Sequence, residues 1–381
     1  MFIRPRRKDY HQAMLDHMNA AHYPDVKNGV CFGIAGMGLQ AILLRDTETF
    51  SKRIVALEKP ANNMTSAAIK NIRLHGYSTH AFFDGVAVYQ NPHLYEELFH
   101  RRARVNQDIT ATSSYLIPQV LEKKGGIIEV GNFCGLYSQS SLCKTLKSLR
   151  RQLTYNKIVF PVGLVLCKHD HALTIGFDPD HNKWALIEAN VGPVQWLRDH
   201  ELATMIKRLF SKNDAIIFDA KIYSVGNNQR AAKNIISAWM LSAAYLQHHV
   251  ITPESALEKD SDSATLLYIS AQNGRLNVVK ELLNNGADIN YSSHNMPSAL
   301  YIAALNGHLD VVNELLDHGA YVNADYYSGV SPLIAAAISK HVDIAIALLD
   351  HGADFNEISH NRKFLRLLRN ESDTGSNVKI R

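Results

Sequence analysis

The chain has 381 residues, of which 46% are hydrophobic and 20% charged, and its formal net charge is +4. This length allows two or three domains, and the composition is that of an ordinary globular protein. The charge is too small to indicate nucleic-acid binding, and no apolar run is long enough for a membrane span. Four cysteines are too few for a disulfide framework, and the basic N-terminus lacks the apolar stretch of a secretory signal. We therefore expect a folded protein that works in a reducing cytosol.

Cys31 opens a run of small and apolar residues that predicts a helix, and a helical pattern continues over residues 40–57. A helix N-terminus and a neighbouring imidazolium both favour a thiolate. Gly33, Gly36 and Gly38 each cost about 1 kcal/mol of helix propensity relative to alanine, which predicts close packing against this helix. Cys31 is thus a candidate nucleophile, and a small buried hydrophobe is the alternative.

Residues 60–150 fit no clear motif, but helical patterns over 94–103 and 142–153 could form an inserted cap over a cleft. Cys134 lies within this stretch as a rival nucleophile. It is the weaker one, because no helix clearly begins there.

Short apolar segments over 158–166, 171–177 and 184–189 predict strands, followed by a helix over 199–210 and a strand over 215–225. A cysteine helix followed by an antiparallel sheet makes an α+β domain. We expect its site to lie between the two halves.

His171 opens one of these strands and Glu188 ends the next. A Cys–His nucleophile pair needs such a third group to orient the imidazole. Asp178, a turn former, and Asn190 are the alternatives for that role.

An alternative hypothesis for His171 is metal binding. Cys167, His169 and His171 occupy alternate positions and would share one strand face. This triplet lacks a clustered fourth ligand, so zinc is the weaker hypothesis.

The order of these motifs resembles the papain-like cysteine peptidases, and most closely the YopT-type bacterial effector branch. Gly29-Val30-Cys31 and His171-Ala172 match two motifs of that branch, and residues 186–192 match the third with Glu188 in place of Asp and Ala189 in place of Pro. The resemblance covers residues 31 to about 225. It implies a papain-like cysteine-protease fold and a triad of Cys31, His171 and Glu188, without cofactor or metal.

One position departs from the papain-like pattern. Asp25 stands where the family usually has a glutamine that donates to the oxyanion, and losing such a donor costs about 10²–10³ in rate. Asn28, Asn190 or backbone amides could take its place. A weakly active or inactive scaffold is therefore an alternative.

Three segments repeat without gaps at a spacing of 33 residues, beginning at Thr265, Ser298 and Ser331. They resemble ankyrin repeats, each a turn and two antiparallel helices that bind proteins as a stack. Leu-Leu pairs recur within them, and Gly-Ala pairs follow at Gly286, Gly319 and Gly352, where a left-handed helix cap is expected.

These patterns divide the chain into domains. We expect a protease domain over 1–227, with 60–150 as the cap, and a helical linker over 228–260 that contains a helix over 230–248. Three repeats over 263–361 and a capping helix with a polar tail over 362–381 follow. The whole is an α+β domain followed by an all-α solenoid.

Asn290, Asn323 and Asn356 recur in the repeat turns. The ankyrin resemblance implies that host asparaginyl hydroxylases could modify them. An ordinary turn role is the alternative.

A Cys–His domain followed by ankyrin repeats resembles the ankyrin-repeat effectors of intracellular bacteria such as Legionella. This resemblance implies secretion by a specialised system into the host cytoplasm or nucleus, and a host protein bound through the repeats. We expect a cysteine-dependent hydrolase, most simply a peptidase. The alternatives are a non-enzymatic adaptor, and an acyltransferase or deamidase that uses the same triad.

Overall fold

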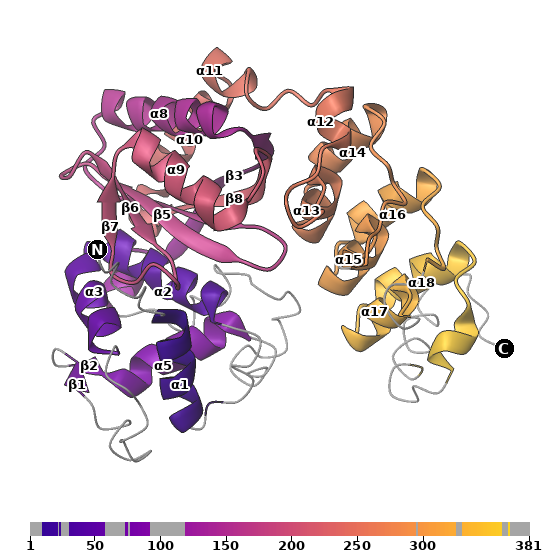
Figure 1. Cartoon of the computed structure of the whole chain (residues 1–381), viewed down its shortest axis with the longest axis horizontal. Helices are drawn as coiled ribbons and strands as arrows, with labels where there is room; N and C mark the ends of the chain where they lie inside the picture. The colour runs from indigo at the N-terminus through magenta and orange to yellow at the C-terminus, as the bar shows by residue number, and fades with distance from the viewer. Residues whose placement is uncertain are drawn as a thin grey trace, which may run out of the picture. The chain divides into compact units, whose positions relative to one another are not determined.

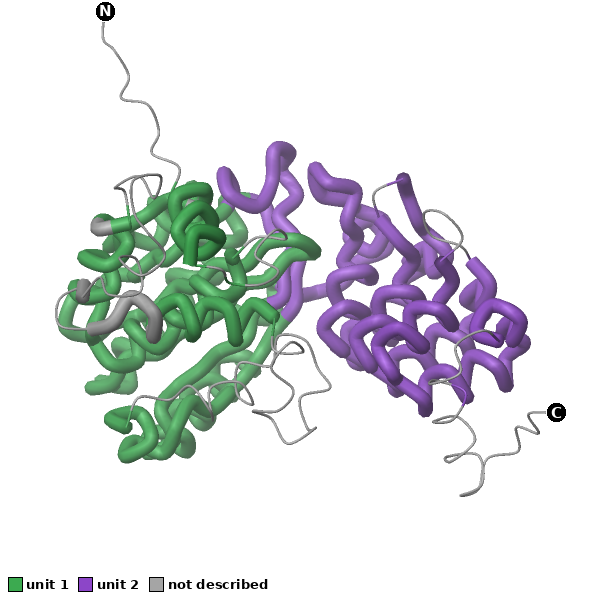
Figure 2. Tube along the Cα trace, turned by 90° about the horizontal axis from the view of Figure 1, so that it is seen from below, with its two compact units in different colours: residues 1–133, 139–206, 220–248 green, residues 134–138, 207–219, 249–381 purple. Residues whose placement is uncertain are grey.

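The computed structural model describes residues 10–21, 23, 30–57, 73–74, 77–91, 119–294, 296–324, 330–359 and 365. The chain divides into two compact units (Figure 2). The first contains residues 1–133, 139–206 and 220–248, and the second contains residues 134–138, 207–219 and 249–381. The chain therefore enters the second unit three times, although the sequence placed residues 134–138 and 207–219 in the N-terminal domain alone.

The N-terminal part of the first unit is mainly helical. Its elements are α1 (Tyr10–Ala20), α2 (Cys31–Leu44), α3 (Thr47–Ala56), β1 (Arg73–Leu74), β2 (Tyr77–Ser78), α5 (Thr79–Gln90) and α7 (Gln119–Lys123). The predicted helix over 40–57 is interrupted. Arg45 adopts a left-handed conformation with φ 59°, and its backbone amide donates to the carbonyl oxygens of Ala41 and Ile42 at the end of α2. The helical pattern over 40–57 gave no sign of this break, which separates α2 from α3.

A six-stranded sheet follows, in the order β3-β8-β4-β5-β6-β7. Its strands are β3 (Ile127–Tyr137), β4 (Val162–Cys167), β5 (Ala172–Asp178), β6 (Lys183–Ile187), β7 (Gln195–Leu197) and β8 (Ile216–Val225). Strands β4 to β7 pair antiparallel in sequence order. The predicted strands are present. However, residues 127–137 form a sheet strand where the sequence suggested a cap, and the patch over 94–103 lies outside the described residues.

Helix α2 packs against α5 and against strands β4 and β5. Its glycines permit this approach, because a Cβ on Gly33 would lie 2.2 Å from the Val86 carbonyl oxygen and one on Gly38 would lie 2.7 Å from Ile187. The Thr174 hydroxyl also donates a buried hydrogen bond of 2.7 Å to the Ala35 carbonyl. The close packing expected of the glycines is thus confirmed, and it fixes the start of α2 against the sheet.

Replacement of Gly36 by alanine is expected to lower the free energy of unfolding of the first unit by about 1–3 kcal/mol. The new Cβ would lie 2.6 Å from the ring of Tyr89, which is fully buried and accepts a hydrogen bond from Gln40. Urea unfolding followed by tryptophan fluorescence measures this, since Trp184, Trp196 and Trp239 all lie in the first unit. A Tyr89→Leu background should reduce the cost. Stabilisation by Gly36→Ala would show that helix propensity alone governs the site.

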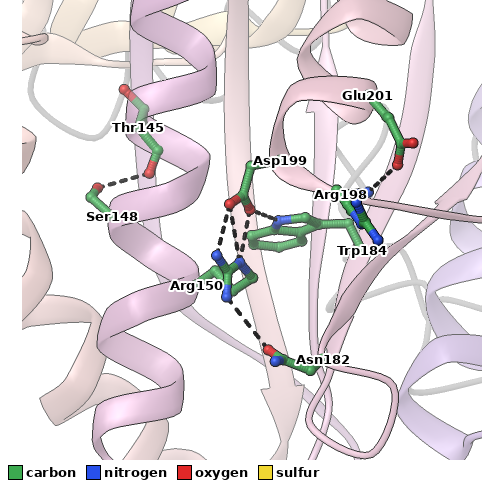
Figure 3. A network of polar contacts seen from close by, with 8 residues as sticks. All are labelled: Thr145, Ser148, Arg150, Asn182, Trp184, Arg198, Asp199 and Glu201. Carbon is green, nitrogen blue, oxygen red and sulfur yellow. Dashed lines mark hydrogen bonds and ion pairs between the residues drawn. The ribbon is translucent and has the colours of Figure 1, made fainter.

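Helices α8 (Gln139–Tyr155), α9 (Asp199–Phe210) and α10 (Gln229–Met240) lie together on one side of the strands, and α2 lies on the other (Figure 1). Arg150 of α8 forms two parallel hydrogen bonds of 2.9 Å with Asp199, which also accepts a 2.9 Å bond from the indole of Trp184 (Figure 3). This partly buried network ties α8 and the start of α9 to strand β6. The predicted helix over 230–248 ends at Met240 and resumes as the short α11 (Ala243–Leu246).

The second unit carries three helix pairs after α12 (Pro253–Leu257). They are α13 (Leu266–Gln272) and α14 (Leu276–Asn284), α15 (Ala299–Asn306) and α16 (Leu309–Asp317), and α17 (Pro332–Ile338) and α18 (Val342–Asp350). The first helix of each pair is capped at its N-terminus by a hydroxyl side chain that accepts a hydrogen bond from a backbone amide of the first turn. The capping residues are Thr265, Ser298 and Ser331. The glycines after the second helices have φ between 80° and 89°, as predicted. Residues 355–358 form a final 3-10 turn, and the predicted capping helix lies almost wholly outside the described residues.

Strand segments of the sheet belong to this second unit because they share its core. Cys134 and Ile217 are buried in one hydrophobic cluster with residues of the first helix pair. Asp219 is fully buried and forms hydrogen bonds of 2.5 and 2.7 Å with Arg275 at the start of α14. These contacts explain why residues 134–138 and 207–219 cluster with the repeats.

Candidate functional site

Cys31 and His171 are placed by two elements that contact each other directly. Cys31 is the first residue of α2 and is partly exposed, and the residue before it gives the helix no side-chain cap. His171 immediately precedes β5, the strand that is bonded to α2 through Thr174. The start of the helix and the start of the strand therefore meet, and the thiol and the imidazole form a hydrogen bond.

Glu188 holds the other side of the imidazole. Its Oε1 lies 3.0 Å from Nε2 of His171, and the carboxylate is fully buried while the histidine side chain is 13% exposed. Asn190 in turn binds Glu188, donating from its side-chain amide to Oε1 at 2.8 Å and from its backbone amide to Oε2 at 2.9 Å. Since Nε2 faces Glu188, the nitrogen left to face the thiol of Cys31 is Nδ1.

The environment of His171 favours its charged form. Burial lowers the pKa of His171, but hydrogen bonds to Cys31 and Glu188 and their negative charge outweigh burial and raise it to about 9. At neutral pH the ring is therefore an imidazolium. A cation held against a thiol at a helix N-terminus is an arrangement that favours the thiolate.

The protonated state of His171 can be measured directly. The ring signals of His171 in an NMR titration are expected to change near pH 9 rather than near the ordinary value of about 6.5. In Glu188→Gln the midpoint should fall by at least about one pH unit, because the amide no longer stabilises the cation by charge. Asp178→Asn, which removes a carboxylate beside His181, is the control and should leave His171 unchanged. An unchanged midpoint in Glu188→Gln would contradict the assignment.

Gln90 lies beside the candidate site, and the sequence did not point to it. It ends α5, and its side-chain oxygen accepts a 3.0 Å hydrogen bond from the backbone amide of Gly33 in the first turn of α2. This bond holds a side-chain amide beside the N-terminus that carries Cys31. Gln90 was missed because 57 residues separate it from Gly33, and only the packing of α5 on α2 brings the two together.

The other candidates occupy different places. Asn28 and Asp25 lie outside the described residues. Asp178 ends β5, about 23 Å of strand away from His171, and it accepts the Asp180 amide in a turn. The chain turns between Cys167, which ends β4, and Ala172, which begins β5. The proposed zinc triplet therefore does not form one strand face.

Cys134 is buried in β3 and accepts a hydrogen bond from Ser270. Burial and the nearby charge of Asp219 raise the pKa of its thiol to about 12. It therefore stays protonated near neutral pH, and Cys31 is the stronger of the two candidate nucleophiles.

Known protein families account for one part of the chain. Residues 267–359 match the family model of ankyrin repeats, in three copies. The ankyrin repeats so identified are the helix pairs α13 to α18, and this family points to protein–protein interaction. No curated protein matches the chain. None of the described helices is long and apolar enough to cross a membrane.

The turn asparagines of the ankyrin repeats link successive turns. The side-chain oxygen of Asn290 accepts the amide of Tyr321 at 2.8 Å, and that of Asn323 accepts the amide of Asp354 at 3.0 Å. Both residues thus have a structural role of the kind that favours asparagine in turns.

Proposed function

We propose that Cys31, His171 and Glu188 form the catalytic triad of a cysteine hydrolase on a papain-like scaffold. The observation that carries the proposal is the His171 imidazole, which lies between the Cys31 thiol and the buried Glu188 carboxylate and has a pKa of about 9. A histidine that serves only the core does not need a cysteine at a helix N-terminus on one side and a carboxylate on the other. This placement of groups meets the needs of nucleophilic catalysis.

In the proposed reaction, the thiolate of Cys31 attacks a carbonyl carbon and forms a tetrahedral intermediate. The His171 imidazolium then gives its proton to the leaving nitrogen, which departs as an amine and leaves a thioester on Cys31. The neutral imidazole next removes a proton from water. The resulting hydroxide attacks the thioester carbonyl, and the C–S bond breaks. The carboxylic acid product leaves, and the Cys31 thiolate and His171 imidazolium are restored. Glu188 keeps the ring oriented and stabilises its positive charge, and Asn190 holds Glu188.

Gln90 is proposed as the donor that stabilises the oxyanion, together with the backbone amide at the start of α2. The side-chain oxygen of Gln90 accepts the hydrogen bond from the Gly33 amide. The Nε2 group of the same side chain is then on the side opposite this bond, where we propose that it donates to the oxyanion. Replacement of Gln90 by glutamate should slow turnover about 10²–10³-fold, because a charged acceptor would replace the donor. Gln12→Glu, an exposed glutamine on α1, is the control. Equal rates for wild type and Gln90→Glu would remove Gln90 from the mechanism.

The ankyrin repeats are proposed to bind the protein on which the thiol acts. A stack of this length offers an extended protein-binding surface, which supports recruitment of a folded target rather than a free small molecule. On the resemblance to Legionella-type effectors, we extend the proposal to a host protein, reached by specialised secretion into the host cytoplasm or nucleus.

A peptide library tests the proposed activity without knowledge of the target. Mixed peptides are incubated with wild type and with Cys31→Ala, and new termini and mass changes are read by mass spectrometry. New amino termini with wild type alone are expected for a peptidase. A gain of about one mass unit without cleavage would instead indicate a deamidase, and peptide acylation a transferase. Identical products from both proteins would favour the adaptor function.

A further inference from the structure

Helix α8 presents a row of cations on its outer face. Lys144, Lys147 and Arg151 follow one another at spacings of three and four residues, so their side chains lie on one side of the helix, and all three are exposed. Tyr155 continues the row and is 84% exposed. The helix spans about 1.5 Å per residue, so this row is about 16 Å long.

No carboxylate neutralises this row within the described part of the chain. The neighbouring Arg150 of α8 is paired with Asp199 (Figure 3), but none of Lys144, Lys147 and Arg151 forms an ion pair with a residue that the structure describes. The sequences of α8, α10 and α11 contain no Asp or Glu. Burial, together with the positive charge of Lys144, lowers the pKa of His248 just beyond α11. The surface therefore carries a concentrated positive charge.

These cations line a groove of about 550 Å³ between α8 and the α10–α11 region. Its other wall includes Trp239 and Gln247, and the indole of Trp239 is held by a 2.8 Å hydrogen bond to Ser148. Two large apolar side chains are exposed directly beside lining residues in the sequence, Leu241 before Ser242 and Leu246 before Gln247. Leu241 is 79% exposed and Leu246 is 49% exposed, on the turn and short helix that Figure 1 shows projecting beyond α8.

We propose that this surface, formed by α8, α10 and α11, binds membranes rich in anionic lipid. Lys144, Lys147 and Arg151 would bind the headgroup phosphates and carboxylates, and Tyr155, Leu241 and Leu246 would enter the interface beside them. Exposed apolar side chains next to unpaired cations are the combination that holds a protein at an anionic bilayer. A soluble polyanion would pair with the cations but would leave the exposed leucines in water, whereas a bilayer would take up both.

Sedimentation of the full chain with phosphatidylcholine vesicles, with and without about 30% phosphatidylserine, tests the proposal. Binding should require phosphatidylserine and weaken as salt is added. The triple variant Lys144→Glu, Lys147→Glu, Arg151→Glu should lose at least about 100-fold in affinity, as each cation contributes about fivefold. Leu241→Ser with Leu246→Ser should lose about tenfold but keep the salt dependence.

The matched control is Lys123→Glu, Lys124→Glu, Lys183→Glu, which reverses three exposed cations of α7, the turn after it and β6. It should bind as wild type does, and circular dichroism checks that every variant is folded. The proposal is overturned if wild type does not bind the anionic vesicles, or if the control loses as much affinity as the groove variant. It also fails if the leucine variant binds normally, or if inositol hexakisphosphate binds the groove while vesicles do not.

Discussion

Replacement of His171 by alanine is expected to slow the alkylation of Cys31 by iodoacetamide at pH 6 by about 10- to 100-fold. With a pKa of about 9, His171 is an imidazolium at this pH and stabilises the negative charge of the thiolate. Without it, a thiol of ordinary pKa is less than about 1% ionised at pH 6. The loss in rate is smaller than the loss of ionisation, because a more basic thiolate is also more nucleophilic.

The control for this substitution is His181→Ala. His181 is half-exposed and stacks on Trp196 near the far end of β5, so its loss should leave the alkylation of Cys31 unchanged. Mass spectrometry of the Cys31 peptide gives both rates. Equal alkylation of wild type and His171→Ala would mean that the imidazole does not activate the thiol, and it would favour the adaptor function.

Replacement of Arg275 by alanine is expected to lower the free energy of unfolding of the second unit by about 3–5 kcal/mol. The substitution leaves the carboxylate of Asp219 fully buried and without the two hydrogen bonds that Arg275 donates. Circular dichroism follows the loss of the repeat helices during urea unfolding. Hydrogen exchange of residues 266–284 shows whether the first repeat opens before the rest.

Two further variants make the Arg275 result interpretable. Lys280→Ala removes an exposed ion pair with Glu314 and should cost less than about 1 kcal/mol. Replacing both buried partners, as Asp219→Leu with Arg275→Met, should recover most of the loss, because no unpaired charge remains. If the double variant is as unstable as Arg275→Ala, the cost is one of packing rather than of a buried charge.

The sequence predicted elements whose signals are local. Cys31 begins a helix, His171 precedes a strand and Glu188 follows the next, and each position is marked by neighbouring residues of the expected size and polarity. The repeats were predictable because one pattern of caps, leucines and glycines occurs three times at the same spacing. Local periodicity also predicted the mixed helix and sheet composition.

What the sequence did not predict depends on contacts between distant segments. The bond from Gly33 to Gln90 and the pair of Asp219 with Arg275 each join residues more than 50 positions apart. The helix break at Arg45 uses a left-handed conformation that arginine rarely adopts, so composition gave no warning of it. The weaker zinc hypothesis assumed that Cys167, His169 and His171 share one strand face, but Cys167 ends β4 and pairs with Ala172 of β5 across a turn.

The most direct test of the account compares two cysteines within one wild-type molecule. Cys31 is hydrogen-bonded to His171 at a helix start, whereas burial and the charge of Asp199 raise the pKa of the Cys143 thiol. Limited alkylation by iodoacetamide at pH 6, with both peptides quantified by mass spectrometry, gives their relative rates. Cys31 is expected to react at least about tenfold faster than Cys143. Equal rates, or faster reaction of Cys143, would contradict an activated thiol at this site.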